Sequence, residues 1–413
     1  MKIKIYPAYY VCMFIFTSLI IFGFLIDSPK EIFNGILEII LNSDILITDY
    51  VELGGIGAAF VNAGLLSLIC IFILIYVGIK PNGSTLMALW LMAGFAFFGK
   101  NLLNVWPVMI GVWLYSKVQK EPFLNYTLIA LLGTTLSPTV SQLSFIGQFS
   151  ILGGILIGII IGIAVGFILP PLGAYCIKLH QGYNLYNIGF AAGLLATMVM
   201  SVFRAFGINF DKRLIWNTGN NKVFFILLIF LFISLIIIGF ILNNRSFKGI
   251  EKIFKHSGRL VSDYYLLYEN LAFINMGILG IIFTIFVVLV KGDLNGPTIG
   301  AIFTIAGFGA FGKHPFNVAP LIIGALLSTF LNIWTIDSPQ MILSCLFSTA
   351  LAPIAGQYGW PYGIIAGFLH VCTVMNTSYL HGGLNLYNNG LAAGLVAILL
   401  VPIINAFRKE PTA

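Results

Sequence analysis

The chain contains two related copies of one long segment. Residues 180–194 and 381–395 share eleven of fifteen positions at an offset of 201, in the common pattern HxGxNLYNxGxAAGL. Residues 59–100 match 272–313 at an offset of 213, and both copies end in Phe-Gly-Lys. Since each offset persists over a whole block of residues, the similarity is an internal duplication, and each copy must be able to fold in the same way.

Composition places the duplicated unit in a lipid bilayer. Of 413 residues, 59% are hydrophobic and 8% are charged, whereas soluble domains are about one quarter charged. The apolar runs have the length of membrane-spanning helices and lack the alternation of a transmembrane barrel. We therefore expect an all-α membrane protein with about ten transmembrane helices in two repeated five-helix halves. The net charge of +7 lies between these runs and does not indicate a nucleic-acid partner.

The duplication also predicts the division of the chain. The N-terminal apolar run is interpreted as a retained helix, because no small-residue cleavage site follows it. Each repeat is preceded by a lead helix. We expect a first half at 1–205, with its lead helix at 7–26 and repeat at 49–205, and a second half at 206–413, with its lead helix at 222–243, a basic loop at 244–262 and its repeat at 263–405.

Equivalent loops of the two halves carry opposite charge. Residues 27–52 hold six acids and one lysine, whereas residues 245–259 hold five basic residues and one acid. Because cytoplasmic loops are enriched in Lys and Arg, this asymmetry favours inverted halves in the inner (cytoplasmic) membrane, with both termini in the cytoplasm. The basic cluster within residues 204–222 would then lie outside, so parallel halves stay open as the alternative.

Several apolar runs are interrupted. Residues 83–115 carry no charge except Lys100, and they are too long for one spanning helix and too short for two. Residues 132–142 contain Gly133 and Pro138. These interruptions predict broken or re-entrant helices, which occur at membrane depth only where protein or a water-filled cavity satisfies the backbone.

Lys100 and Lys313 are the leading candidates for a solute site. Each occupies the same position of the repeat within an otherwise uncharged stretch. A charge inside the bilayer is costly, which favours a function such as attraction of an anion or an ion pair within the bundle. A lysine that extends to the membrane interface from a helix end, or from a short surface turn, is the alternative.

Polar residues repeated in both halves form the second group of candidates. Their amides and hydroxyls could line a path for a small polar solute near helix N-termini. Helix capping and close helix packing are the alternative roles. The candidate substrate-binding pairs are Asn184 and Asn385, Tyr186 and Tyr387, Asn187 and Asn388, Asn104 and Asn317, and Asn62 and Asn275.

No enzymatic motif accompanies these residues. The chain lacks a Walker motif, an HExxH motif and a GxSxG motif. Its cysteines lie inside apolar runs without CxxC spacing, and His180 and His381 are expected in interfacial loops. We therefore predict no catalytic residue, no metal site, no cofactor and no enzyme activity.

The duplicated organisation, with Asn-Leu-Tyr-Asn at 184–187 and 385–388, resembles an uncharacterised family of duplicated bacterial polytopic membrane proteins of unknown function. The resemblance covers nearly the whole chain and implies no activity. Residues 60–64 and 182–184 are also similar in part to the Asn-Asn-Pro-x-Ser-Gly and Gly-Tyr-Asn-Gly segments of urea transporters, without the proline of the first or the last glycine of the second. That partial resemblance implies inverted five-helix halves.

These observations predict a membrane transporter or channel. It would move a small polar, anionic solute through a pathway between two pseudo-symmetric halves. Its expected partners are the solute and the lipid bilayer, and assembly as a homo-oligomer stays open. Two other functions stay open as well: a urea-like channel for a neutral solute, and an intramembrane enzyme or assembly factor.

Overall fold

The computed structural model describes residues 5–147, 150–211, 213–331 and 333–408. Within these ranges the chain is helical, apart from one parallel bridge between Thr48 and Ile215. Nine helical segments there are long and apolar enough to cross a bilayer, and four shorter apolar helices accompany them. The count is one below the expected ten, because the segment Trp360–Thr377 carries His370 and Asn376 and is too polar to qualify.

The two halves have the same element order, so that each helix of the first half has an equivalent ten numbers later. The first half contains α1 (Pro7–Ile26), α2 (Pro29–Leu41), α3 (Tyr50–Gly54), α4 (Ile56–Val77), α5 (Gly83–Phe95), α6 (Val105–Val118), α7 (Thr127–Gly133), α8 (Ser137–Phe145), α9 (Ile151–Leu179) and α10 (Asn187–Ala205), with 3-10 turns η1 (Phe123–Asn125) and η2 (Thr134–Leu136).

The second half repeats this order with small differences at the turns. It contains α11 (Asn221–Leu242), α12 (Ile250–Ile253), α13 (Tyr264–Tyr268), α14 (Leu271–Leu289), α15 (Gly296–Gly307), α16 (Pro315–Leu327), α17 (Pro339–Ser348), α18 (Ala352–Tyr358), α19 (Trp360–Thr377) and α20 (Asn388–Phe407), with 3-10 turns η3 (Phe308–Ala310), η4 (Ser328–Leu331) and η5 (Thr349–Leu351).

The expected helix breaks are present at equivalent places. In each Phe-Gly-Lys the glycine has a positive φ, 92° at Gly99 and 106° at Gly312, a conformation that residues with a side chain rarely adopt. The backbone therefore turns directly before each lysine. The turn separates α5 from α6 and α15 from α16, so each apolar stretch is broken into two short helices.

The two halves are inverted relative to each other. The Asp263 carboxylate follows the basic segment 244–262 and accepts hydrogen bonds of 2.8 and 2.9 Å from the backbone N–H of Gly83, at the start of α5. Asp49, in the acidic segment 27–52, accepts a backbone hydrogen bond from Gly296, at the start of α15. Equivalent helices therefore enter the bundle from opposite ends, which we call the basic face and the acidic face after these two segments.

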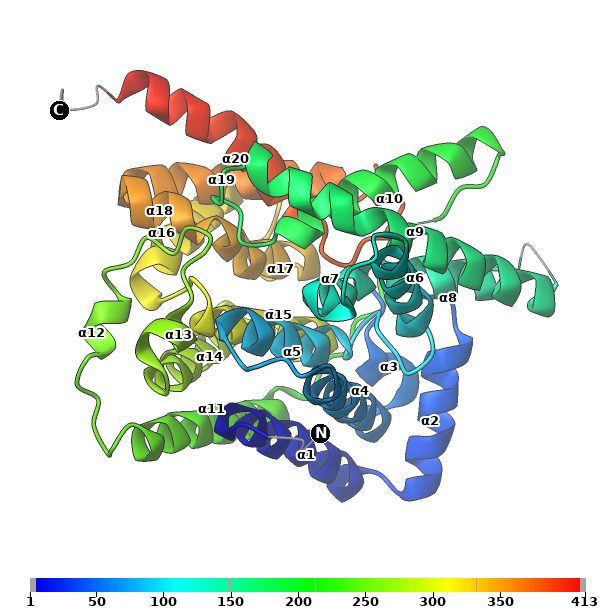
Figure 1. Ribbon diagram of the computed structural model, residues 1–413, viewed down its shortest axis with the longest axis horizontal. Coiled ribbons are helices and arrows are strands. Elements are labelled where there is room, and N and C mark those ends of the chain that lie inside the picture. Colours follow the sequence, from blue (N-terminus) through cyan, green and yellow to red (C-terminus); the bar gives the residue numbers. More distant parts are fainter. Residues whose placement is uncertain (1–4, 148–149, 212, 332, 409–413) are drawn as a thin grey trace.

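Charge separates the two faces along the bundle. In Figure 1 the basic face, with α12 and α13, lies at the left, and the acidic face, with α2, lies at the right. Arg259 and Arg408 also lie at the basic face, where they contact the rings of Tyr183 and Tyr358. The hydroxyls of these two tyrosines are hydrogen-bonded to each other at 2.8 Å. The C-terminal end of α20 therefore lies at the basic face, together with the basic loop of the same half.

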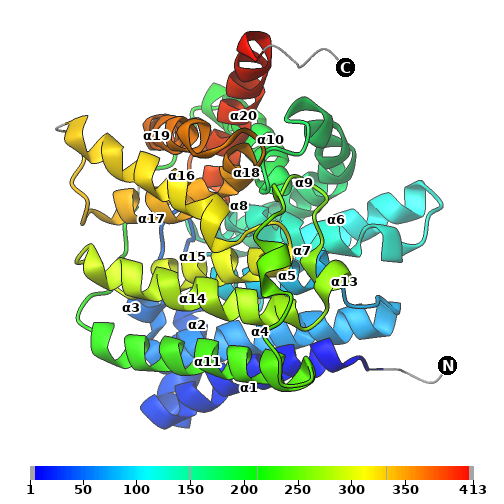
Figure 2. The ribbon, with the colours of Figure 1, turned by 90° about the vertical axis from the view of Figure 1, so that its left-hand side faces the viewer.

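Equivalent helices meet along the junction between the halves. α1 and α11 lie together at one side of the bundle, α5 and α15 pack at its centre, and α10 and α20 cross at the opposite side (Figures 1 and 2). Glycines permit the close crossings: a Cβ on Gly94 would lie 2.7 Å from the carbonyl oxygen of Gly300, and one on Gly189 would lie 3.2 Å from the Cα of Gly390. Small residues at such crossings are typical of helix packing in membranes.

Candidate functional site

Two cavities lie along the junction between the halves. The basic-face cavity, of about 270 Å³, extends inward from Ser84, Leu260 and Val261 to Tyr186 and Tyr387. The acidic-face cavity, of about 240 Å³, is lined by residues 45–47, 210–211 and 213–214 and extends inward to Leu386, Asn388 and Asn389. The two cavities therefore open toward opposite faces and converge on the same central region.

The two cavities are related by the duplication. Leu128 and Ile177 line the basic-face cavity, and the residues 215 and 201 positions later, Leu343 and Ser378, line the acidic-face cavity. Asn187 likewise lines the basic-face cavity, and its equivalent, Asn388, lines the acidic-face cavity. The inverted repeat thus produces one cavity for each face, each built from equivalent helices of opposite halves.

A thin wall separates the cavities. Phe347, Leu386 and Asn389 line both of them, and we call these three residues the partition. The Phe347 ring stacks on Phe95 at 5.9 Å and meets Tyr186 edge-on at 6.2 Å. Because aromatic contacts hold the ring of Phe347 on both sides, the partition has a defined position at the centre of the bundle.

Lys100 and Lys313 lie behind the cavity walls, and neither lines a cavity directly. Both side chains are fully buried. The Lys100 ammonium donates to the Tyr387 hydroxyl at 2.7 Å, and the Lys313 ammonium donates to the Tyr186 hydroxyl at 2.6 Å and to the Thr349 hydroxyl at 2.7 Å. Each lysine therefore contacts the tyrosine of the opposite half. In the described part of the chain no carboxylate contacts either ammonium.

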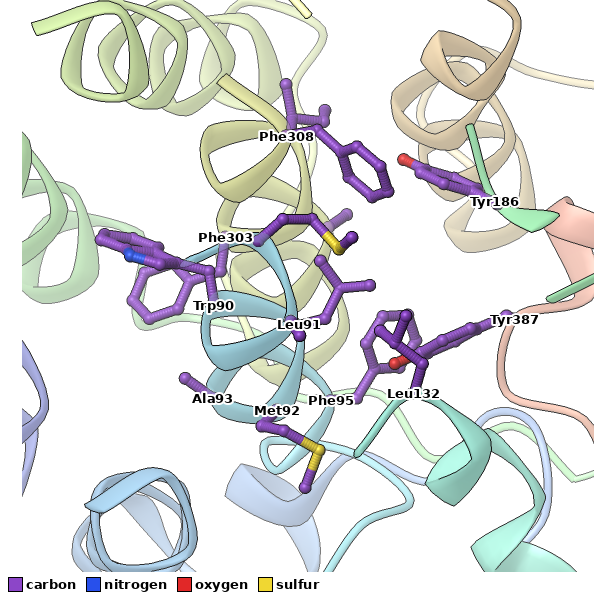
Figure 3. Close-up of a cluster of buried hydrophobic side chains, with 14 of the residues drawn as sticks. Trp90, Leu91, Met92, Ala93, Phe95, Leu132, Tyr186, Phe303, Phe308 and Tyr387 are labelled. Atoms are coloured by element: carbon purple, nitrogen blue, oxygen red, sulfur yellow. The ribbon is translucent and has the colours of Figure 1, made fainter. Parts of the chain in front are cut away.

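The tyrosine rings form the boundary between these lysines and the basic-face cavity. Figure 3 shows Tyr186 reaching toward Phe308 and Tyr387 toward Phe95, from the side of the cavity opposite α5 and α15. The Lys100 Nζ lies 4.8 Å from the Tyr387 ring centroid, and the Lys313 Nζ lies 4.5 Å from that of Tyr186. The aromatic faces partly compensate the two buried charges. We call Lys100–Tyr387 and Lys313–Tyr186 the crossed dyads.

Two of the predicted asparagine pairs hold the turns at Gly99 and Gly312 in place. Asn62 donates to the carbonyls of Ala96 and Lys100, at 2.7 and 3.0 Å, and Asn275 makes the equivalent bonds to Gly309 and Lys313. Asn104 and Asn317 donate to the carbonyls of the turn glycines, Gly99 and Gly312. Their amides satisfy backbone that leaves the helix at membrane depth, which places them in supporting positions outside the cavities.

The Asn-Leu-Tyr-Asn segments join the halves. Asn184 donates to the carbonyl of Gly390 at 3.0 Å, and Asn385 donates to the carbonyl of Gly189 at 3.2 Å. Asn187 and Asn388 line the two cavities, and each is hydrogen-bonded to a histidine of its own half. Those histidines, His180 and His381, lie in turns between helices, as expected of loop residues, and both are buried in the protein.

Arginines distinguish the acidic-face cavity from the basic-face cavity. Arg204 and Arg213 line the first together with one acid, Asp211, whereas no charged residue is found among those lining the second. Arg204 donates to the carbonyl of Tyr379 at 2.6 Å, and Arg213 donates to that of Ser43 at 2.8 Å. Both donate to neutral carbonyl groups, and their positive charge is partly offset by Asp211 in the same cavity and by Asp44, which interacts with Arg213. From the sequence, this basic cluster entered only the argument about the orientation of the halves. It was not predicted to contribute to a solute site.

A buried carboxylate at the acidic face supports the turn at Gly99. Asp44 accepts a hydrogen bond from the Tyr50 hydroxyl, and its Oδ2 lies 3.5 and 3.4 Å from the amide nitrogens of Asn101 and Asn104. Burial raises the pKa of the Asp44 carboxyl to about 7, although Arg213 favours its ionised form. The equivalent position of the second half is Gly258, so this carboxylate has no counterpart at the basic face.

Comparison with known proteins is consistent with this organisation. A family model described as a protein of unknown function (DUF1576) matches residues 28–205 and 242–406, which together make up most of the chain in two blocks. No curated protein and no solved structure matched the chain, so the partial resemblance to urea transporters finds no support there. The two blocks correspond to the two inverted halves apart from their lead helices, α1 and α11, and the chain belongs to this duplicated DUF1576 family.

Proposed function

We propose that the protein is a transporter that moves a small polar, anionic solute across the membrane by alternating access. The observation that carries the proposal is the pair of equivalent cavities, which open toward opposite faces and share the partition. In inverted-repeat transporters the two halves can exchange conformations, and this exchange moves the opening from one face to the other around a fixed central site. The crossed dyads and the partition would form that site.

The charges favour an anion over a cation or a neutral solute. Two buried lysines lie directly behind the walls of the basic-face cavity, and two arginines line the acidic-face cavity against one acid, Asp211. Positive groups on low-dielectric walls raise the local concentration of anions. A neutral-solute channel would gain nothing from these costly charges, and the partition would obstruct it.

The two faces differ in charge, as is typical of the cytoplasmic and outer sides of an inner-membrane protein. The basic face carries the positive loop that the cytoplasmic side attracts, and the acidic face carries residues 27–52. We assign the basic face to the cytoplasm, which also places the N-terminal end of α1 and the C-terminal end of α20 there. The arginines of the acidic-face cavity would then meet solutes that arrive from outside.

Counterflow in proteoliposomes tests the proposal. The purified chain is reconstituted with a high internal concentration of one solute, and uptake of the same labelled solute is measured for acetate, lactate, chloride, sulfate and urea. We expect at least one anion to show saturable uptake that is accelerated by the internal solute, and urea to show none. Rapid flux without acceleration by internal solute would identify a channel, and flux of urea alone would overturn the assignment of an anion.

A further inference from the structure

The lysines of the crossed dyads have no negatively charged partner among the described residues. An ammonium group has three N–H donors. Lys100 has one oxygen acceptor, the Tyr387 hydroxyl, and a weak sulfur contact with Met92 at 3.6 Å, while Lys313 has two hydroxyl acceptors. Fully buried lysines are rare unless they are paired with an opposite charge. A bound anion within the central region would supply the missing negative charge for both.

The hydroxyl of Tyr387 can extend the preference for an anion from Lys100 to the basic-face cavity. The Tyr387 oxygen accepts a hydrogen bond from Lys100, so its own O–H group must donate elsewhere. In the described ranges no protein group accepts that proton. Tyr387 lines the basic-face cavity, and its hydroxyl can therefore donate to a ligand there. A hydroxyl that already accepts from an ammonium group is a stronger donor to an anion, because linked hydrogen bonds strengthen each other.

The rest of the basic-face cavity is unsuited to a strongly hydrated ion. Besides the dyad tyrosines, its walls near the centre are formed mainly by apolar side chains: Met87, Leu91, Phe95, Leu132, Phe308 and Phe347. Sulfate or phosphate would lose its water shell there without enough donors to replace it, which is costly. A ligand with an apolar body would instead bury that body against these walls and gain free energy from it.

We infer that the solute is a small organic monocarboxylate with an apolar body, held with its carboxylate at the crossed dyads and its body against the walls of the basic-face cavity. This inference rests on the proposed function, because it names the solute class of the same site. The cavity volume of about 270 Å³ is slightly below the range of about 300–1,000 Å³ for sites that hold drug-sized ligands, so the ligand is small. Benzoate and butyrate are suitable probes.

Equilibrium binding to the purified protein tests the solute class without requiring transport. Thermal unfolding is recorded with benzoate, with the neutral benzamide of nearly the same shape, and with sulfate. We expect benzoate to raise the unfolding temperature and to bind at least tenfold more tightly than benzamide, with no shift from sulfate. Tyr387→Phe and Lys100→Met should each weaken benzoate binding several-fold. Tyr183→Phe and Lys117→Met are the matched controls, since both residues lie outside the cavities.

The outcomes separate the inference from the proposed function. Equal affinity for benzamide, tighter binding of sulfate, or benzoate binding that survives both Tyr387→Phe and Lys100→Met would overturn the inference. Specific benzoate binding without counterflow of benzoate or butyrate would support the inferred ligand class and contradict transport. Counterflow of an inorganic anion without benzoate binding would support transport and contradict the inferred class. If Lys100→Met does not fold, Tyr387→Phe decides the question, because it retains the ring.

Discussion

The two cavities are built from equivalent helices, yet their chemistry differs. The basic-face cavity is lined by apolar side chains and the dyad tyrosines, and the acidic-face cavity has three charged residues, Arg204, Arg213 and Asp211. Duplication accounts for the shared shape, because equivalent positions line both. Divergence between the copies accounts for the charges. In our account the acidic-face cavity attracts the solute and the crossed dyads at the centre bind it. The two cavities are therefore similar in shape but differ in their affinity for the solute.

The largest effect is expected at the partition. Phe347→Ala removes the ring that separates the cavities, whereas Leu132→Ala, at the equivalent position, alters only the basic-face cavity. We expect Phe347→Ala to raise passive solute leak about a hundredfold, which corresponds to lowering a barrier by about 2.7 kcal/mol. Leu132→Ala should leave the leak near that of the wild-type protein. Equal leak in the two variants, measured in proteoliposomes without a gradient of other ions, would show that the partition is not the barrier.

The crossing of α10 and α20 should respond to added bulk in either half. A methyl group on Gly189 would lie 2.7 Å from Tyr387 Cβ and 3.2 Å from Gly390 Cα, and one on Gly390 would lie 2.8 Å from Gly189 Cα. We expect Gly189→Ala and Gly390→Ala each to destabilise the protein by about 1–3 kcal/mol, as overpacking does. Gly153→Ala, near the start of α9, is the control. Unfolding temperatures in detergent measure the effect, and an unchanged value for both junction variants would refute the close crossing.

The arginines should act from one face only. Arg204→Gln and Arg213→Gln remove charge from the acidic-face cavity alone. We expect each to raise the KM for anion entry at the acidic face about fivefold, because a partly exposed charge contributes about 1 kcal/mol. The KM for entry at the basic face should stay the same. Uptake by vesicles of known orientation measures both constants, and high salt should reduce the difference. A rise of KM at both faces would place the arginines in the shared central site instead.

The smallest effect concerns Asp44, which has no equivalent at the basic face. Since burial raises the pKa of this carboxyl to about 7 in the folded protein, the folded state retains a proton that the unfolded state releases near pH 4. Stability should therefore fall as pH rises from about 4 to about 7. Asp44→Asn should reduce this slope, and the remainder would come from Asp49, whose pKa burial also raises to about 7. Unfolding temperatures across this range test it, and an unchanged slope in Asp44→Asn would contradict it.

Most of the fold could be predicted from the sequence, since repetition and charge are visible in the residues themselves. The duplication, the all-α membrane fold, the inversion and the helix breaks near Lys100 and Lys313 are confirmed. It was not predicted that Asp49 and Asp263 would each accept a hydrogen bond from the start of a helix in the opposite half. These two acids could be interpreted only as part of the loop charge, because their partners are distant in sequence.

The site was less predictable than the fold. The repeated polar residues identified the crossed dyads, but their pairing depends on how the halves pack, which no local pattern contains. Phe347 and Leu386 were missed, because an apolar side chain in a partition cannot be distinguished by sequence from one that faces lipid. Whether the twelve predicted residues bind solute stays a prediction; Tyr186, Tyr387, Asn187 and Asn388 are those that line the two cavities.

Access of thiol reagents to equivalent positions of the two cavities tests the central claim most directly. Ile177→Cys and Ser378→Cys, each in a background without the five native cysteines, place one thiol in each cavity at the same position of the repeat. Our account predicts that a membrane-impermeant reagent labels the first only from the basic face and the second only from the acidic face. Labelling of both thiols from one face would contradict inverted halves with oppositely directed cavities.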